Sequence, residues 1–194
     1  IINSNNKIIH MVATESNMSP IGSKAANFDL YFPSKKTKIS FSSSTKGKGF
    51  LIAFICNHCP YVVHLKDNFP TLFNSFLAKD IKVFAISSND VTKYPADSPD
   101  EMARISKEWD FDFPYLYDET QEIAKSYKAA CTPDFFLYNK NKELFYRGQY
   151  DDSRPRNQIP ISGKDINSAV ELMLKGLPSP EEQKPSIGCN IKWK

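Results

Sequence analysis

The 194-residue chain lacks several features that would place it in a specialised class of protein. No apolar run approaches the roughly 18 residues of a membrane span. The 25 basic and 22 acidic residues nearly cancel, and the lysines are scattered, so the charge predicts neither a nucleic-acid partner nor a membrane surface. Only four cysteines are present, too few and too unevenly spaced for the disulfide framework of a small secreted protein. With 41% hydrophobic residues, the chain is long enough to bury one core without disulfides.

The same scarcity of cysteine sets an expectation for the cellular compartment. One close pair, Cys56 and Cys59, and two single residues, Cys131 and Cys189, are more typical of redox or metal chemistry than of a scaffold. Because thiols stay reduced in the cytoplasm, we expect a cytoplasmic protein. Residues 1–10 are too polar for a signal peptide, but the chain begins with Ile rather than Met, so a leaderless mature exported form stays an alternative.

The most informative segment that is present is Cys56-Asn57-His58-Cys59-Pro60, between an apolar run and a predicted helix. A Cys-x-x-Cys at such a junction predicts that the first thiol lies at the helix N-terminus, where unpaired N–H groups and the helix dipole favour an anion. This environment produces a thiolate near neutral pH. A protonated His58 stabilises the same thiolate further. The motif therefore predicts thiol–disulfide chemistry.

The rest of the chain is predicted to alternate between strands and helices. Apolar or alternating runs indicate strands over 28–32, 50–55, 81–86, 134–138 and 143–147, with a hairpin or loop at 35–48. The first of these strands suits a sheet edge and the second suits the sheet centre. Helical spacing and caps indicate helices over 60–78, 98–109, 118–127 and 166–175. Pro70 predicts a kink in the first helix.

This order of elements predicts an α/β fold, with a central mixed β-sheet and helices on both faces. One domain is expected over residues 21–177. It lies between an N-terminal arm, residues 1–20, and an irregular C-terminal tail, residues 178–194.

Four features together resemble the thioredoxin superfamily, and within it the peroxiredoxin-like branch of the alkyl hydroperoxide reductase/thiol-specific antioxidant (AhpC/TSA, or redoxin) family. They are the entry sequence of residues 21–30, the cysteine pair after a buried strand, Thr132-Pro133 before a hairpin, and the strand-turn-strand-helix ending. Residues 184–194 are similar to the tail of an uncharacterised subfamily often labelled thiol–disulfide isomerase or thioredoxin. The resemblance implies a thioredoxin-like fold.

The resemblance also implies roles for individual residues. Pro133 is expected to be cis and to pack beside the cysteine pair, with the backbone of Thr132 exposed for β-type pairing with an extended substrate. In this scheme Cys56 attacks a substrate disulfide, Cys59 resolves the mixed disulfide, and His58 tunes the couple.

Two departures from the family patterns bear on the activity. Peroxiredoxins carry Thr or Ser three residues before the peroxidatic cysteine, whereas Ala53 stands three residues before Cys56. Thioredoxins carry a buried Asp six residues before the first cysteine, and here that position is Phe50. A histidine before the second cysteine is shared with disulfide isomerases, so His58 predicts a couple more oxidising than thioredoxin.

Five other residues are candidates for a functional role, a structural role or either. Cys131 is either a third redox thiol or a small buried hydrophobe. Cys189, in the tail, is a candidate resolving or intermolecular thiol. His64 faces either the cysteines or solvent, and Asp134 either mediates proton transfer from Cys59 or forms a turn. Asn57 is expected to shape the loop and cap the helix.

The sequence therefore predicts a dithiol–disulfide oxidoreductase that acts on protein or small-molecule disulfides. Neither a cofactor nor a metal is required, the electrons come from an unidentified thiol reductant, and the protein is a monomer or homodimer. Three alternatives stay open: a thiol peroxidase resolved by Cys59 or Cys189, a copper- or zinc-handling protein that uses the cysteine pair and a histidine, and a non-catalytic binding domain.

Overall fold

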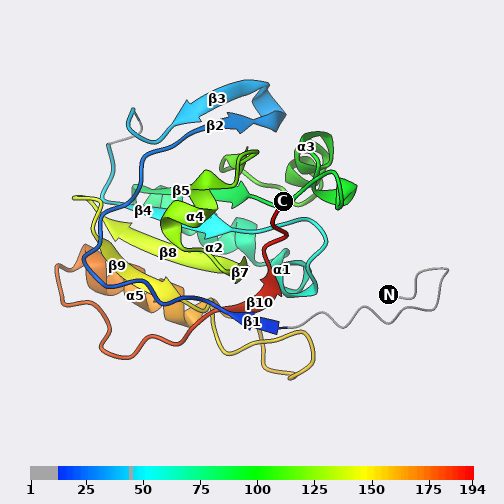
Figure 1. The fold of residues 1–194 in the computed structure, drawn as a ribbon. Coiled ribbons are helices and arrows are strands. Elements are labelled where there is room, and N and C mark those ends of the chain that lie inside the picture. Colours follow the sequence, from blue (N-terminus) through cyan, green and yellow to red (C-terminus); the bar gives the residue numbers. More distant parts are fainter. Residues whose placement is uncertain (1–12, 44–45) are drawn as a thin grey trace.

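A computed structural model of the chain describes residues 13–43 and 46–194, and its main feature is a seven-stranded mixed sheet (Figure 1). The strands follow the order β3 (Thr37–Ser40), β2 (Asp29–Phe32), β6 (Tyr115–Tyr117), β5 (Ile81–Ser87), β4 (Gly49–Phe54), β8 (Asp134–Asn139) and β9 (Leu144–Gly148). β4, β5 and β6 are parallel, and the other neighbours are antiparallel. The predicted α/β class with a central mixed sheet is confirmed.

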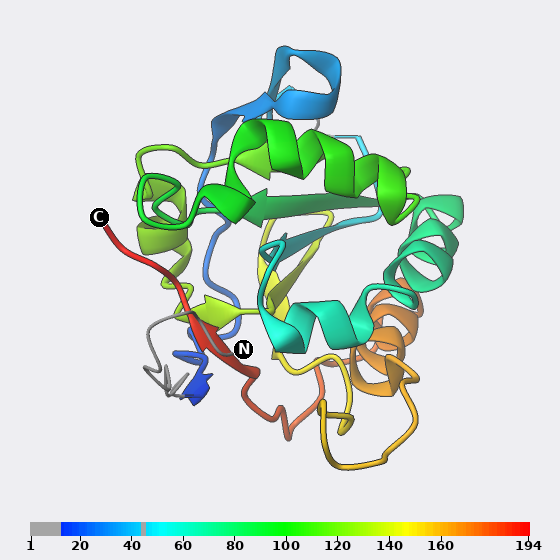
Figure 2. The same cartoon turned by 90° about the vertical axis from the view of Figure 1, so that its right-hand side faces the viewer.

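Helices cover both faces of this sheet and enclose two hydrophobic cores (Figure 2). β4 is buried along its whole length, and its side chains alternate between the two cores, as expected for a central strand. One core contains residues of α1 (Pro60–Leu65), α2 (Phe69–Ala78), α3 (Pro99–Glu108) and α5 (Lys164–Leu174). The other contains residues of α4 (Glu122–Tyr127). No helix within the described residues is long and apolar enough to cross a membrane.

The helix predicted over residues 60–78 is two helices rather than one kinked helix. α1 ends at Leu65, and α2 begins at Phe69. Pro70 lies in the first turn of α2, where its missing N–H is not needed, so the break precedes the proline. The cap predicted at Ser98 is confirmed, because its hydroxyl accepts a hydrogen bond from the Glu101 N–H at 3.4 Å.

Short strands account for the main differences from the sequence prediction. β6 was not predicted, and β2 is not an edge strand because β3 pairs beyond it within the predicted hairpin segment. Residues 44–45 of that segment lie outside the described residues. Three or four residues show too little periodicity to be recognised as a strand.

A second, three-stranded sheet pairs strands from near the two ends of the chain with a strand from residues 131–132. Among the described residues it consists of β1 (Ala13–Glu15), β10 (Ile187–Asn190) and β7 (Cys131–Thr132), with β10 in the centre and antiparallel to both neighbours (Figure 1 and Figure 2). The prediction that residues 178–194 form an irregular tail is therefore wrong over Ile187–Asn190. Residues 1–12 of the predicted N-terminal arm lie outside the described residues.

Gly188 allows β10 to approach the main chain of Thr132 and Pro133. A Cβ atom at position 188 would lie 2.0 Å from the Thr132 carbonyl oxygen and 3.1 Å from the Pro133 nitrogen. Gly148 likewise allows the C-terminal segment to approach β9 at Lys184, because a Cβ atom at position 148 would lie 2.1 Å from the Lys184 carbonyl oxygen. Both contacts involve backbone atoms, which cannot rotate away as a side chain can. The path of the C-terminal segment therefore depends on glycine at these two positions.

We expect Gly188→Ala to weaken the packing of β10, because the added methyl group overlaps the Thr132 carbonyl. Overpacking of this kind lowers the free energy of unfolding by about 1–3 kcal/mol, which urea unfolding measures. The control is Asn190→Ala, which truncates an exposed side chain in the same strand and leaves the packing unchanged. Equal stability of the two variants would contradict the role given to Gly188.

Candidate active site

Three of the four cysteines meet at one place, although they come from three parts of the chain. Cys56 follows β4, Cys59 precedes α1, and Cys189 lies in β10. The Sγ atoms of Cys59 and Cys189 are 2.7 Å apart. The exposed fractions of Cys56, Cys59 and Cys189 are 1%, 0% and 3%, so all three thiols are buried. The predicted proximity of the Cys-x-x-Cys pair thus extends to a third sulfur atom.

Thr132 contacts both members of the motif from the end of β7. Its hydroxyl oxygen lies 3.4 Å from Cys56 Sγ, and its carbonyl oxygen lies 3.1 Å from Cys59 Sγ. The Thr132–Pro133 peptide bond is cis, as predicted. Thr132 is not open to an extended substrate, however, because it is buried and pairs with Cys189 of β10. The edge expected to bind substrate is therefore occupied by the chain's own C-terminal strand.

The helix terminus lies three residues further along the chain than the motif suggested. α1 begins at Pro60, and Cys59 rather than Cys56 is its N-cap residue. Asn57 does not cap α1, because its side-chain amide donates to the Ala96 carbonyl and accepts from the Tyr115 hydroxyl. The predictions that Cys56 lies at the helix N-terminus and that Asn57 caps the helix are therefore wrong.

The buried thiols differ in acidity because each one affects its neighbours. Contacts with Cys189, and next with Cys56, lower the pKa of Cys59. Burial is the main cause that raises the pKa of Cys56, and contact with Cys59 adds to it. The pKa of Cys189 is also raised, chiefly by its contact with Cys59 and by burial. These contacts favour the thiolate at Cys59 rather than at Cys56, where the sequence predicted it.

A buried carboxylate, Asp97, supports the loop between the two cysteines. It belongs to the short 3-10 helix η2 (Pro95–Asp97), and its Oδ1 atom accepts the Asn57 N–H at 2.8 Å. Its Oδ2 atom accepts a hydrogen bond from the Asn89 side-chain amide, also at 2.8 Å. Sequence reasoning missed Asp97. Its only signal was its position just before the Ser98 cap, and that signal carries no information about contact with residue 57.

His58 lies between this carboxylate and the outside of the protein. Its Nδ1 atom is 2.8 Å from Asp97 Oδ2, although the ring is not aligned for a regular hydrogen bond. The ring stacks on Tyr94 with centroids 5.6 Å apart, and 28% of the side chain is exposed. The close Asp97 carboxylate raises the pKa of His58, which favours the imidazolium form. A charged His58 offsets the carboxylate, whose field otherwise raises the pKa of Cys56.

The same residues form a group that has the donor atoms of a metal site. Cys56 Sγ, a ring nitrogen of His58 and a carboxylate oxygen of Asp97 all lie within 4.8 Å of one another. His64, by contrast, forms a hydrogen bond of 3.1 Å with the Ser153 hydroxyl. Any ligand set in this part of the described chain would therefore include His58 rather than His64.

Cys131 and Asp134 flank the Thr132–Pro133 segment in sequence, and both side chains are buried. The Cys131 Sγ atom is 3.5 Å from the Pro133 carbonyl and 4.0 Å from the Ser186 carbonyl, so its described contacts are with oxygen rather than sulfur. Burial raises its pKa, as is typical of an inert thiol. Burial also raises the pKa of Asp134 to about 8, and its Oδ2 atom accepts the Ala130 N–H at 3.3 Å.

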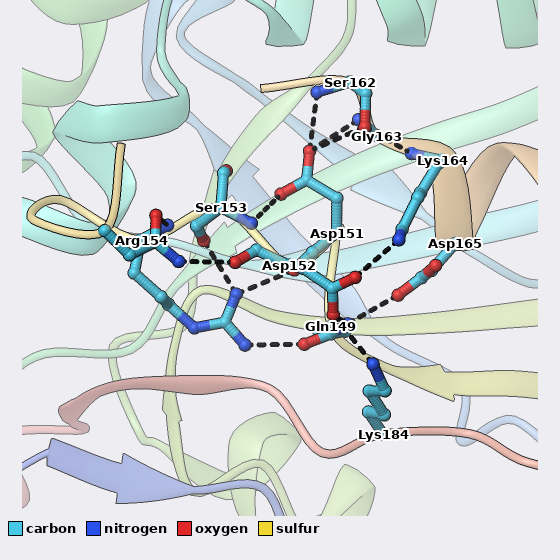
Figure 3. Close-up of polar contacts among 11 residues, drawn as sticks. Gln149, Asp151, Asp152, Ser153, Arg154, Ser162, Gly163, Lys164, Asp165 and Lys184 are labelled. Atoms are coloured by element: carbon cyan, nitrogen blue, oxygen red, sulfur yellow. Dashed lines mark hydrogen bonds and ion pairs between the residues drawn. The ribbon is translucent and has the colours of Figure 1, made fainter. Parts of the chain in front are cut away.

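A polar network holds the loop between β9 and α5 (Figure 3), and residues of this loop line a small pocket together with Pro133. The buried Asp151 accepts hydrogen bonds from the N–H groups of Ser153, Ser162 and Gly163. The Arg154 guanidinium donates to Gln149 and to two loop carbonyls, and Asp152 pairs with two lysines. The charged side chains of this loop therefore hold its conformation through hydrogen bonds and ion pairs. The pocket is lined by residues that include His64, Pro133, Arg154 and Ile187.

Comparison with known proteins gives a family match over most of the chain. Residues 21–147 match the model of the AhpC/TSA family. No match was found among curated proteins. Among solved structures, an uncharacterized conserved protein from Geobacillus kaustophilus shares 47% identity over 95% of this chain and 97% of its own, with a TM-score of 0.92.

Two further solved structures extend the comparison. A hypothetical protein from Sinorhizobium meliloti 1021 is 39% identical over 93% of this chain and 98% of its own, with a TM-score of 0.91. A thiol:disulfide interchange protein of the thioredoxin family from Chlorobium tepidum is 15% identical over 80% of this chain and 99% of its own, with a TM-score of 0.60. This last likeness shows that the fold is thioredoxin-like.

Asp97→Asn is expected to lower the pKa of His58, because it removes the negative charge that stabilises the imidazolium. It is also expected to lower the pKa of Cys56, whose ionisation the same carboxylate opposes. An NMR titration of the His58 ring and the pH dependence of Cys56 alkylation measure the two effects. Asp100→Asn, an exposed carboxylate in the first turn of α3, is the matched control. An unchanged His58 titration would contradict the pairing with Asp97.

Proposed function

Because the chain belongs to the AhpC/TSA family and has a thioredoxin-like fold, we propose that it acts as a thiol–disulfide oxidoreductase through the couple Cys56 and Cys59. The observation that carries this proposal is the arrangement of the two thiols around Thr132. One sulfur is next to its hydroxyl and the other is next to its carbonyl. A buried dithiol with one lowered and one raised pKa has the unequal thiols that disulfide exchange uses.

In the proposed reaction, Cys56 attacks a substrate disulfide and forms a mixed disulfide, releasing one substrate thiolate. Cys59 then attacks the Cys56 sulfur, which releases the second thiolate and leaves a Cys56–Cys59 disulfide. Two electrons pass to the substrate, and a thiol reductant returns them. Because the contacts favour the thiolate at Cys59, Cys59 acts as the base that takes the proton of Cys56 as Cys56 attacks, and the Thr132 carbonyl accepts a hydrogen bond from the protonated Cys59.

The burial of the thiols restricts how a substrate disulfide can reach them. Thr132 is covered by β10, so a disulfide-containing protein has to displace that strand to pair with the Thr132 backbone. A small disulfide needs only a local opening beside His58, whose ring is the partly exposed group at the motif. We propose a small-molecule or protein disulfide as substrate in the cytoplasm, where reducing thiols are available.

Cys56→Ser and Cys59→Ser are each expected to abolish the reduction of insulin disulfides by dithiothreitol that the protein catalyses. Turbidity of the released insulin chains measures the rate. Cys131→Ser is the control, since it removes a buried thiol without a described sulfur contact. Full activity of the double variant Cys56→Ser/Cys59→Ser in this assay would sink the proposal, and full biological function of the same variant would favour a non-catalytic domain. Faster turnover with hydrogen peroxide than with insulin would favour a thiol peroxidase.

A second candidate function is the handling of a soft metal ion. The specific observation in its favour is the close group of Cys56, His58 and Asp97, with Cys59 adjacent. Thiolate and imidazole ligands suit zinc and copper(I). Only this local group supports the idea, whereas family, fold and motif all support redox activity.

If this second function holds, protein purified without added metal should contain about one equivalent of zinc or copper by elemental analysis, as expected for a single structural site. His58→Ala should lose that metal, and the matched control His64→Ala should keep it. Metal-free wild-type protein that also fails to bind copper(I) in a titration would remove this candidate.

A further inference from the structure

We propose that Cys189 is a third member of the redox centre, and that it takes over the disulfide from Cys56 to form a Cys59–Cys189 disulfide in the oxidised protein. This inference deepens the proposed function and rests on it. It assigns a chemical role to the C-terminal strand β10, which the Cys-x-x-Cys motif by itself does not include.

The separation of the sulfur atoms is the first observation that supports it. The Sγ atoms of Cys59 and Cys189 are 2.7 Å apart, whereas a disulfide bond measures about 2.04 Å. A movement of less than an ångström therefore brings the two sulfurs to bonding distance. Both side chains are buried, so water does not separate them.

The second observation is that the backbone fixes Cys189 in this position. Cys189 pairs with Thr132 on one side of β10 and with Ala13 on the other. Beyond β10, the Lys192 N–H donates to Asn89 Oδ1, and the Lys192 carbonyl accepts from the Asp90 N–H. The close approach at Gly188 sets the depth of the strand. The sulfur contact is thus built into the fold and does not depend on one flexible side chain.

The proposed step is an internal disulfide exchange. Cys189 gives up its proton and attacks Cys59 of the Cys56–Cys59 disulfide. A Cys59–Cys189 bond forms, the Cys56–Cys59 bond breaks, and the electron pair of the broken bond leaves on Cys56. Cys56 then takes up a proton. The number of disulfides is unchanged, so no oxidant is needed beyond the substrate disulfide that formed the first bond.

This exchange changes which cysteine carries the free thiol and how β10 is attached to the site. Cys56 becomes a free thiol again while the protein stays oxidised. The new bond ties β10 covalently to the start of α1. Oxidation therefore locks β10 over the edge at Thr132, whereas in the reduced protein only non-covalent contacts hold β10 there.

Tryptic mapping tests the proposal because the cysteines fall in separate peptides. Cys56 and Cys59 share peptide 49–66, Cys131 lies in 129–140, and Cys189 lies in 176–192, since trypsin does not cut between Lys184 and Pro185. The protein is equilibrated in graded mixtures of reduced and oxidised glutathione, quenched with acid, alkylated with N-ethylmaleimide and digested. The expected oxidised product links 49–66 to 176–192, with the alkyl group on Cys56.

Two other products have distinct meanings. A disulfide confined to peptide 49–66, with Cys189 alkylated in every mixture, overturns the inference and leaves the proposed Cys56–Cys59 function intact. Absence of both disulfides overturns the inference and the proposed function together. A link to 176–192 that leaves Cys59 rather than Cys56 alkylated also overturns the inference.

Variants provide a second, quantitative measurement. If the Cys59–Cys189 form is favoured tenfold, Cys189→Ser removes that preference and raises the midpoint potential by about 30 mV for a two-electron couple. Cys131→Ser is the matched control and leaves the midpoint unchanged, because its sulfur contacts carbonyl oxygens. An unchanged midpoint in Cys189→Ser would contradict the tenfold preference, and the peptide map would then have to show the 49–66 disulfide alone.

Discussion

The packing of β10 against the Thr132–Pro133 segment is the contact on which the rest of the site depends. It brings Cys189 to Cys59, buries the Cys-x-x-Cys pair and occupies the strand edge that the family pattern leaves to substrate. The contact is possible because position 188 has no side chain. A short strand with little hydrophobic content of its own thus determines both the number of thiols in the centre and their access to solvent.

Charge compensation is the second constraint on the centre. Asp97 is fully buried and needs partners, which it finds in the Asn57 N–H, the Asn89 amide and His58. A buried carboxylate opposes ionisation of a neighbouring thiol, and a charged histidine reduces that opposition. His58 therefore acts on the thiols partly through Asp97. This differs from the direct pairing of His58 with a Cys56 thiolate that the motif suggests.

Much of the architecture was predictable because long apolar segments dominate it. The strand before the motif, the helices with clear caps and the hairpin after Pro133 all followed from periodicity and turn residues. The strands that were missed, β1, β6, β7 and β10, have two to four residues each. Segments this short are stabilised by pairing with distant partners, so local sequence does not reveal them. The break before Pro70 was misplaced for a similar reason, because a helix boundary depends on packing as well as on proline.

The sequence by itself determined the chemistry available to this protein: a Cys-x-x-Cys pair with an internal histidine, after a buried strand, in a chain whose pattern matches a thioredoxin-like fold. Only the tertiary structure decided which groups surround that pair. Asp97 is about 40 residues from the motif and Cys189 is 130 residues from Cys59, as their hydrogen bonds record. The reason is physical, because the contacts that set acidity, burial and sulfur proximity join strands and loops that are adjacent only after the sheets have formed.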